Sequence, residues 1–229
     1  CPARASVNPK SAGMFPAPTP IMAATQHFAS ILAQELQRIA CMRQEDSCWM
    51  DYRTIKPILI GVIGGDGIGP TISHETQTVL EYLLRDHLAR KEVKFKIIEG
   101  LTIKNRASKG RSVPKDVLDE VKKCHVLLKG PTHTPELGDG WPNLESANVV
   151  LRKELDLFAN IRPVRIPKYG IDWTFFRENT EDLYALGSQG INVTPDLAID
   201  FRVITAPGSE RILEAAFAHA QRTGKSKVT

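Results

Sequence analysis

The side chains with the clearest chemical meaning lie in one stretch, Ser146 to Pro163, which reads SANVVLRKELDLFANIRP. Asn148 and Arg152 are four residues apart, so they share one face if this segment is a helix. An amide, the Ser146 hydroxyl and a guanidinium together supply several hydrogen-bond donors, and an arginine can grip a carboxylate through two charge-assisted bonds. The stretch therefore predicts a pocket for an anion. The alternative is an ordinary solvated helix face, because most charged side chains are exposed.

Arg162 is the second arginine of this stretch and lies ten residues beyond Arg152. Pro163 follows it, and a proline disfavours a continuous helix because it lacks the backbone donor. Arg162 is therefore expected outside the helix, in a broken segment. It reaches the same pocket only if the chain turns back.

Alternating strands and helices are expected to position these residues. Residues 58–63 (ILIGVI) have the composition of a buried strand, and a glycine-rich turn follows at 64–70. The pattern then predicts a helix over 71–90, a strand over 93–98, a helix over 114–123 and a strand over 125–129. Such alternation is typical of a parallel α/β sheet, in which ligands bind at the carboxyl ends of the strands. The turns at 64–70 and 130–140 follow strands and so lie at that edge.

The second half of the chain continues with strands at 172–177 and 197–205 and a helix at 207–223, where Gly224 suits a left-handed cap. Helical spacing predicts an inward apolar face on each long helix. In the helix over 71–90 this face comprises Ile72, Val79, Leu80, Leu83, Leu84 and Leu88. In the helix over 207–223 it comprises Ile212, Leu213, Ala216, Phe217 and Ala220.

The first 55 residues are read as a disordered or extension segment. Residues 1–20 hold five prolines and no acidic side chain, which is typical of a tail. Residues 21–42 have the spacing of an amphipathic helix. An organelle transit peptide is one alternative, and an extension of no catalytic importance before Met50 is another. Because the chain begins with Cys1 and ends in strand-like residues, we expect a fragment.

Composition excludes several classes of function. The net charge of +4 is too small to indicate nucleic acid, and no apolar run reaches the length of a membrane span. The four cysteines lack the paired spacing of a zinc site, so we expect reduced thiols and a cytoplasmic location, with the mitochondrion as the alternative. The turn at 64–70 matches neither the dinucleotide fingerprint nor the phosphate-binding loop.

Three motifs in order carry a resemblance: GDGIGP at 65–70, S-x-N-x-x-x-R at 146–152 followed by ELDLFANIRPVR, and FRENTEDLY at 176–184. Together they resemble the isocitrate and 3-isopropylmalate dehydrogenase family over about residues 58–229. The resemblance implies a truncated α/β fold with a parallel or mixed sheet flanked by helices. It also implies part of a large domain at 56–157 and the start of a smaller α+β domain at 158–229.

The family oxidises a 2-hydroxy acid with NAD or NADP and then removes a carboxylate, using Mg or Mn. The resemblance implies that Arg152, Arg162 and Arg177 clamp substrate carboxylates and that Tyr184 protonates the enol. It places Ser146 and Asn148 at the carboxylate that varies between substrates. It places Thr132 and Thr134 near the nicotinamide and substrate, and this loop aligns least well, because residues 136–142 depart from the pattern.

Chemistry favours a polycarboxylate substrate, because Ser146 and Asn148 offer donors where an isopropyl group would need apolar side chains. We therefore expect isocitrate to be converted to 2-oxoglutarate, with 3-isopropylmalate, homoisocitrate or tartrate as alternatives. By resemblance, the catalytic lysine and the metal-binding aspartates lie beyond Thr229. The full-length protein is expected to be a homodimer and these 229 residues alone to be inactive. A regulatory subunit that binds without chemistry is the remaining alternative.

Overall fold

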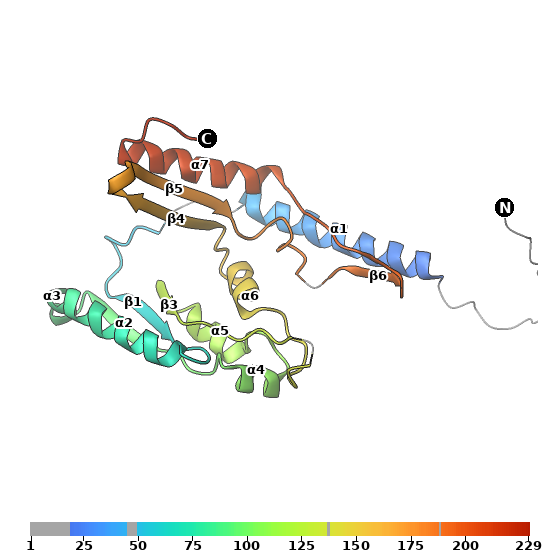
Figure 1. The fold of residues 1–229 in the computed structure, drawn as a ribbon, viewed down its shortest axis with the longest axis horizontal. Coiled ribbons are helices and arrows are strands. Elements are labelled where there is room, and N and C mark those ends of the chain that lie inside the picture. The colour runs from blue at the N-terminus through green and yellow to red at the C-terminus, as the bar shows by residue number, and fades with distance from the viewer. Residues whose placement is uncertain (1–18, 45–49, 137, 188) are drawn as a thin grey trace, which may run out of the picture.

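The computed structural model describes residues 19–44, 50–136, 138–187 and 189–229. These residues form a three-stranded parallel sheet flanked by helices and two antiparallel strand pairs (Figure 1). The predicted α/β fold class is confirmed. Within the described residues, no helix is both long enough and apolar enough to cross a lipid bilayer.

The parallel sheet has the strand order β2-β1-β3, with β1 (Ile58–Ile63) in the centre, β2 (Val93–Ile97) on one side and β3 (Val126–Lys129) on the other. All three predicted strands are confirmed. The chain passes from strand to strand through helices, which supply the long crossover connections that parallel pairing requires. These helices are α2 (Gly69–Leu83), α3 (Arg85–Ala89), α4 (Ile103–Lys109) and α5 (Lys115–Val121).

One hydrophobic core lies between this sheet, α5 and α6 (Ala147–Glu154). It is built from aliphatic side chains that are almost completely removed from water. Its members are Ile63, Ile98, Leu101, Val113, Val117, Val121, Ala147 and Leu151. The last two belong to α6, so the predicted helix with Asn148 and Arg152 is fastened to the core.

The second part of the molecule is built on an antiparallel ribbon of β4 (Ala159–Ile166) and β5 (Ile171–Glu178), joined by the 3₁₀ turn η1 (Pro167–Tyr169). Helix α7 (Ala206–Thr223) packs against β5. A short pair, β6 (Ile191–Thr194) and β7 (Leu197–Ile199), follows the ribbon. Helix α1 (Pro20–Gln44) lies along β6 and reaches α7 (Figure 1). Gly224 closes α7 with φ +69°, as predicted.

Several local predictions were wrong. Residues 159–166 form a strand despite Pro163, because a ribbon strand has one unpaired edge where the missing N–H costs nothing. The predicted strand at 197–205 ends at Ile199, and Val203 forms only an isolated bridge with Asp182. The predicted helix over 71–90 is interrupted at Leu84. Helix α4 and strand β6 were not predicted.

The inward faces predicted for the long helices are also partly wrong. In α2 the exposed fraction is 57% for Val79 and 65% for Leu83, and in α7 it is 60% for Phe217. Helix α2 packs on the sheet through small residues instead: Gly69 and Ser73 are buried, and Ser73 donates to the Ile63 carbonyl. Small side chains allow close backbone approach, which turns the larger apolar residues outward.

Candidate functional site

Helix α6 carries the first part of the site. Ala147 and Leu151 are buried in the core, so the helix has little freedom to rotate. Ser146 is the residue before its first turn, and its side chain makes no capping bond. Asn148 and Arg152 follow four residues apart, and all three side chains are half-buried. The helix therefore fixes where these three side chains lie, and the Ser146 hydroxyl is not taken up in capping it.

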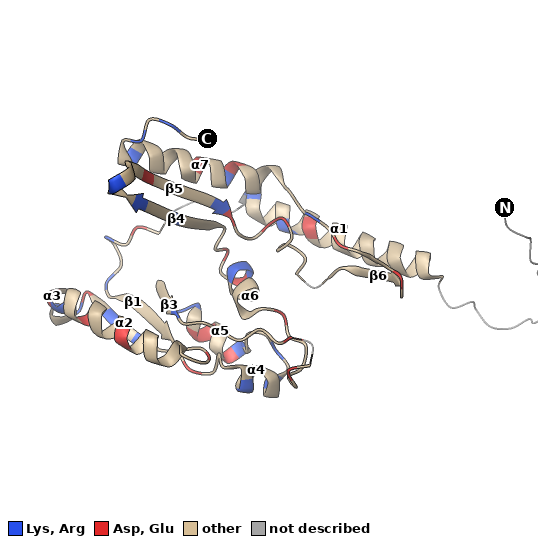
Figure 2. Ribbon diagram, in the orientation of Figure 1, with Lys and Arg blue, Asp and Glu red and all other residues tan. Residues whose placement is uncertain are grey.

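Strand β5 and the turn after it carry the second part. Arg177 Nη2 donates a 2.9 Å hydrogen bond to Tyr184 Oη. The guanidinium carbons of Arg177 and Arg152 lie 5.3 and 5.5 Å from the centre of the Tyr184 ring. Tyr184 therefore stands within cation–π distance of two arginines from separate elements. Figure 2 shows basic residues on α6 and at the C-terminal end of β5. Arg152 belongs to α6 and Arg177 to β5.

Arg162 joins this group less directly. In β4 it lies opposite Phe175, and Asn160 lies opposite Arg177. Cross-strand partners share a face of the ribbon, so Arg162 and Arg177 project from the same face. Arg162 Nε donates to Asn160 Oδ1 at 2.9 Å. Among the contacts of the described residues, none joins Arg162 to Tyr184.

The loop after β3 contains Thr132 and Thr134. Thr132 Oγ1 accepts a 3.3 Å bond from Lys129 Nζ, whereas Thr134 is exposed. Lys129 is a site residue that sequence reasoning missed. Burial lowers the pKa of Lys129, and the positive charges of Arg106 and Arg152 lower it further. A lysine that ends an apolar strand before Gly-Pro was the available signal, since strand ends of parallel sheets hold ligands.

The FRENTEDLY motif divides into residues that build a turn and residues that face the site. The Glu178 carboxylate accepts the backbone N–H groups of Thr180 and Glu181 at 2.8 and 2.5 Å, and the Thr180 hydroxyl at 2.6 Å. The turn is thus closed by its own first carboxylate. The side chains of Arg177 and Tyr184, on either side of the turn, take no part in these bonds and instead contact each other in the site.

Arg211 of α7 ties this turn to the linker between α6 and β4. Its Nη2 donates to Thr180 Oγ1 at 2.8 Å, and its Nη1 binds both Asp156 carboxylate oxygens at 3.0 and 2.8 Å. Its guanidinium carbon also lies 4.5 Å from the Phe158 ring centre. Arg211 therefore holds the elements that carry Arg152 and Tyr184 at a fixed separation.

The glycine turn at 64–70 positions a loop in this structure. Asp66 accepts the backbone N–H of Ile103 and of His133, both at 2.8 Å, and donates its own N–H to the Pro131 carbonyl at 2.8 Å. Gly65 has φ +74°, and a Cβ there would collide with the Pro131 carbonyl oxygen. The predicted tight turn is confirmed, and it holds the loop that contains Thr132.

Arg106 joins the loops around the site through a buried guanidinium group. It is fully buried, and it donates to the carbonyls of Ser112 at 2.7 Å, His133 at 2.6 Å and Glu145 at 3.3 Å. Burial lowers the pKa of Arg106, and Asp66 raises it. The segments on either side of α6 and the threonine loop are joined through this one guanidinium.

The site carries an excess of positive charge. No ion pair within 4 Å among the described residues includes Arg152 or Arg177, although Arg177 is near enough to help lower the pKa of Asp182. In the same part of the chain, no three His, Cys, Asp or Glu side chains gather to hold a metal. The residues present therefore do not fit a metal site of their own. They fit an anion, because two guanidinium groups and a half-buried lysine converge where a negative charge would be compensated.

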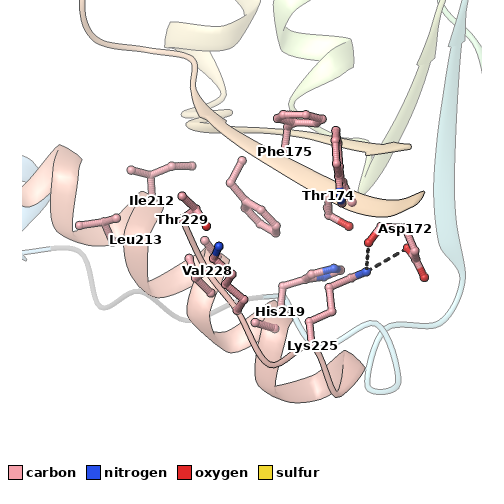
Figure 3. A pocket seen from close by; sticks show the side chains of 14 residues that line it. Asp172, Thr174, Phe175, Ile212, Leu213, His219, Lys225, Val228 and Thr229 are labelled. Carbon is pink, nitrogen blue, oxygen red and sulfur yellow. Dashed lines mark hydrogen bonds and ion pairs between the residues drawn. The ribbon is translucent and has the colours of Figure 1, made fainter. Parts of the chain in front are cut away.

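A separate cavity of about 590 Å³ lies between β5, α7 and residues 225–229 (Figure 3). Its lining is mainly apolar and includes Phe176, Ile212 and Val228. Lys225 closes one side by donating to the Asp172 carbonyl at 2.6 Å and to its Oδ1 at 2.9 Å. None of the predicted site residues lines this cavity.

Residues 59–229 match the family model described as isocitrate/isopropylmalate dehydrogenase. The chain belongs to this family. A crystal structure of the TT0538 protein from Thermus thermophilus matches with a TM-score of 0.55 at 38% identity, over 71% of this chain and 32% of that one. The family resemblance drawn from the three motifs is confirmed.

Other members of the isocitrate/isopropylmalate dehydrogenase family include the NADP isocitrate dehydrogenase of T. thermophilus, 39% identical over 74% of this chain and 34% of the relative. The mitochondrial NAD isocitrate dehydrogenase subunit 2 of Schizosaccharomyces pombe is 31% identical over 74% and 43%. The homoisocitrate dehydrogenase of Methanocaldococcus jannaschii is 34% identical over 73% and 50%. The chain thus spans about a third to a half of these relatives.

Proposed function

We propose that the full-length protein is a β-decarboxylating dehydrogenase that converts isocitrate to 2-oxoglutarate. The observation that carries the proposal is the grouping of Arg152 and Arg177 around Tyr184 without an ion-pair partner among the described residues. Arg152 is half-buried, and a charge without a partner is costly there, whereas Arg177 is exposed and open to a ligand, so an anion that binds both would stabilise this arrangement. A polycarboxylic acid supplies such charges in the number that several guanidinium groups can bind.

Each predicted residue has a role in this proposal. Arg152, Arg162 and Arg177 bind substrate carboxylates. Ser146 and Asn148 bind the carboxylate that distinguishes isocitrate from 3-isopropylmalate, because a hydroxyl and an amide favour an anion over an alkyl group. Thr132 and Thr134 would border the nicotinamide of NAD or NADP, a cofactor that would supply the hydride acceptor. Lys129 adds a further donor at the end of β3.

Tyr184 is proposed as the catalytic acid. The hydrogen bond from Arg177 occupies a lone pair of the Tyr184 oxygen and leaves its O–H hydrogen free to point elsewhere. That proton can pass to the carbon that has lost carbon dioxide. The phenolate left behind would lie beside two guanidinium groups, which stabilise its negative charge.

The remaining chemistry needs groups that these residues do not supply. Mg or Mn would polarise the hydroxyl and ketone in the proposed reaction, and the described residues offer no group of three His, Cys, Asp or Glu side chains to hold it. The 229 residues alone are therefore proposed to bind substrate without turning it over, and the full-length protein to act as a homodimer. The reduced cysteines Cys41 and Cys124 favour a cytoplasmic location, with the mitochondrion as the alternative.

Calorimetric titration of this chain with isocitrate, homoisocitrate and 3-isopropylmalate tests the proposal. We expect isocitrate to bind best, and Arg152→Met and Arg177→Met each to weaken binding by about tenfold or more, since a hydrogen bond to a charged group contributes about 1.5–3 kcal/mol. Arg165→Met is the matched control, because Arg165 is exposed on the opposite face of the ribbon from Arg162. Unchanged isocitrate affinity in both site variants would overturn the proposal.

Substrate choice is tested separately by replacing both Ser146 and Asn148 with leucine. The double variant should lose isocitrate affinity by roughly tenfold or more and gain affinity for 3-isopropylmalate, because it exchanges donors for apolar surface. If the ratio of the two affinities stays the same, these two residues do not select the substrate.

A further inference from the structure

Helix α1 precedes the residues that match the family model, yet it is packed into the second part of the molecule (Figure 1). Ile31 is buried, with 3% of its surface exposed. The Phe28 ring stacks on Phe201 with centroids 5.3 Å apart, and His27 Nε2 lies 3.1 Å from the Gln189 carbonyl. Apolar, aromatic and polar contacts together fix the position of α1 along β6.

The most specific contact of α1 is an ion pair with the FRENTEDLY motif. Arg38 Nη2 lies 2.9 Å from Glu181 Oε1, and Arg38 Nε lies 2.8 Å from Glu35 Oε2. The Glu181 side chain is only 5% exposed, so its charge depends on partners within the protein. Arg38 is the cationic partner that reaches it.

Glu181 also ties α7 to the same turn. Its carboxylate accepts Thr205 N–H at 3.0 Å and the Thr205 hydroxyl at 2.5 Å, and Thr205 is the N-cap of α7. A side chain at Gly208 would collide with this carboxylate. The Glu181 carbonyl in turn accepts the N–H of Tyr184 at 3.1 Å. One buried carboxylate thus links α1, the start of α7 and the backbone of the proposed catalytic tyrosine.

We propose that Arg38 is a positioning residue for the substrate site, and that α1 braces the turn that carries Tyr184. Without Arg38, Glu181 keeps its hydrogen bonds to Thr205 but loses the charge that balances it. A buried carboxylate in that state moves toward water, and the turn moves with it. The segment before the family match is then a working part of the site and not an inert extension.

Amide hydrogen exchange on the full 229-residue chain tests the brace directly. Arg38→Leu should speed exchange at residues 181–187 by roughly tenfold. A change of this size lies between the stability lost on removing an exposed ion pair and that lost on breaking a buried one. Arg38→Lys should restore part of the protection because it keeps the charge. Arg43→Leu is the matched control, since Arg43 is exposed on the same helix, and it should change nothing.

The affinity of the chain for tricarballylate, a tricarboxylate probe, tests whether loss of Arg38 weakens binding at the substrate site. This second experiment rests on the proposed function. Arg38→Leu should weaken binding about five- to tenfold, a coupling of ordinary size between linked sites, and Arg38→Lys should recover part of it. Unchanged exchange at 181–187 in Arg38→Leu would overturn the brace, as would an equal rise in β1, which indicates general destabilisation. If the wild-type chain fails to bind the probe while exchange still rises locally, the proposed function fails and the brace stands.

Discussion

The two parts of the molecule are held together by different forces. The sheet unit, residues 57–157, encloses a core of aliphatic side chains that are all below 8% exposed. Both units also expose large apolar side chains, for example Leu83 at 65% in the sheet unit and Trp173 at 57% in the ribbon unit, which comprises residues 158–229 together with α1. The turns of the ribbon unit are fixed mainly by charged hydrogen bonds through Glu178, Glu181 and Arg211.

This difference bears directly on the site, which lies where the units meet. Arg152 is carried by the sheet unit, and Arg177 and Tyr184 are carried by the ribbon unit. Burial of apolar surface is not directional and tolerates small shifts, whereas hydrogen bonds demand specific geometry. One wall of the site is therefore held by bulk packing, and the other by a few polar contacts that single substitutions can remove.

The largest effect is expected where the sheet unit uses a polar contact in its interior. Arg106→Leu leaves three carbonyls without their donor, and a buried group left unsatisfied costs about 1–3 kcal/mol. We expect the free energy of unfolding to fall by about 3 kcal/mol or more, measured by urea denaturation followed by circular dichroism. Arg111→Leu, at an exposed position nearby, should change it by less than about 0.5 kcal/mol. Similar values for the two variants would show that Arg106 does not join the loops.

A smaller effect should appear without any substitution. Amides of β1 should exchange at least about tenfold more slowly than those of β5, because local opening is cheapest where little apolar surface is buried, and tenfold corresponds to about 1.4 kcal/mol. Native-state hydrogen exchange with peptide resolution measures both strands in one sample. Equal protection would mean that the two units unfold together and that the sheet unit is not held more firmly than the ribbon unit.

Sequence patterns identified the parts of the fold that depend on local composition. Strand β1 is an apolar, mainly β-branched segment followed by a glycine-rich turn, and its bounds match the prediction. Strand β4 was missed because Pro163 suggests a break, although pairing with β5 in a ribbon accommodates it. The pattern could not show that α2 packs through Gly69 and Ser73, since that depends on backbone approach to β1.

The site shows the same limit. Arg152, Arg177 and Tyr184 were named from motifs, and the structure brings them into contact. The contacts that hold these residues in position, made by Arg106, Arg38 and Glu181, could not be predicted from the sequence. No sequence pattern distinguishes Arg106 from an exposed arginine, and its burial follows from loops that include His133 and Glu145, far along the chain. Arg38 and Glu181 are 143 residues apart, and no local pattern joins them.

The smallest effect concerns the surface of the sheet unit, where charges do little. Lys123 and then Lys96 hold the pKa of Glu120 at about 2, below its ordinary value of 4.5. The folded state thus binds this proton less readily than the unfolded chain, so the contribution is complete above pH 4.5 and is lost as the pH falls toward 2. Glu120→Gln should therefore be less stable than the wild type at about pH 7 and approach it near about pH 3, by urea denaturation.

Lys123→Met separates this ion pair from general charge effects. Removing the first cause should raise the pKa of Glu120 toward its ordinary value, so the loss of stability on acidification should be smaller than in the wild type and complete at a higher pH. Exposed pairs contribute little and are screened by salt, so added salt should reduce the difference. A large, salt-insensitive effect would mean that this surface pair stabilises the sheet unit as strongly as its interior does, which contradicts the contrast drawn between packing and polar contacts.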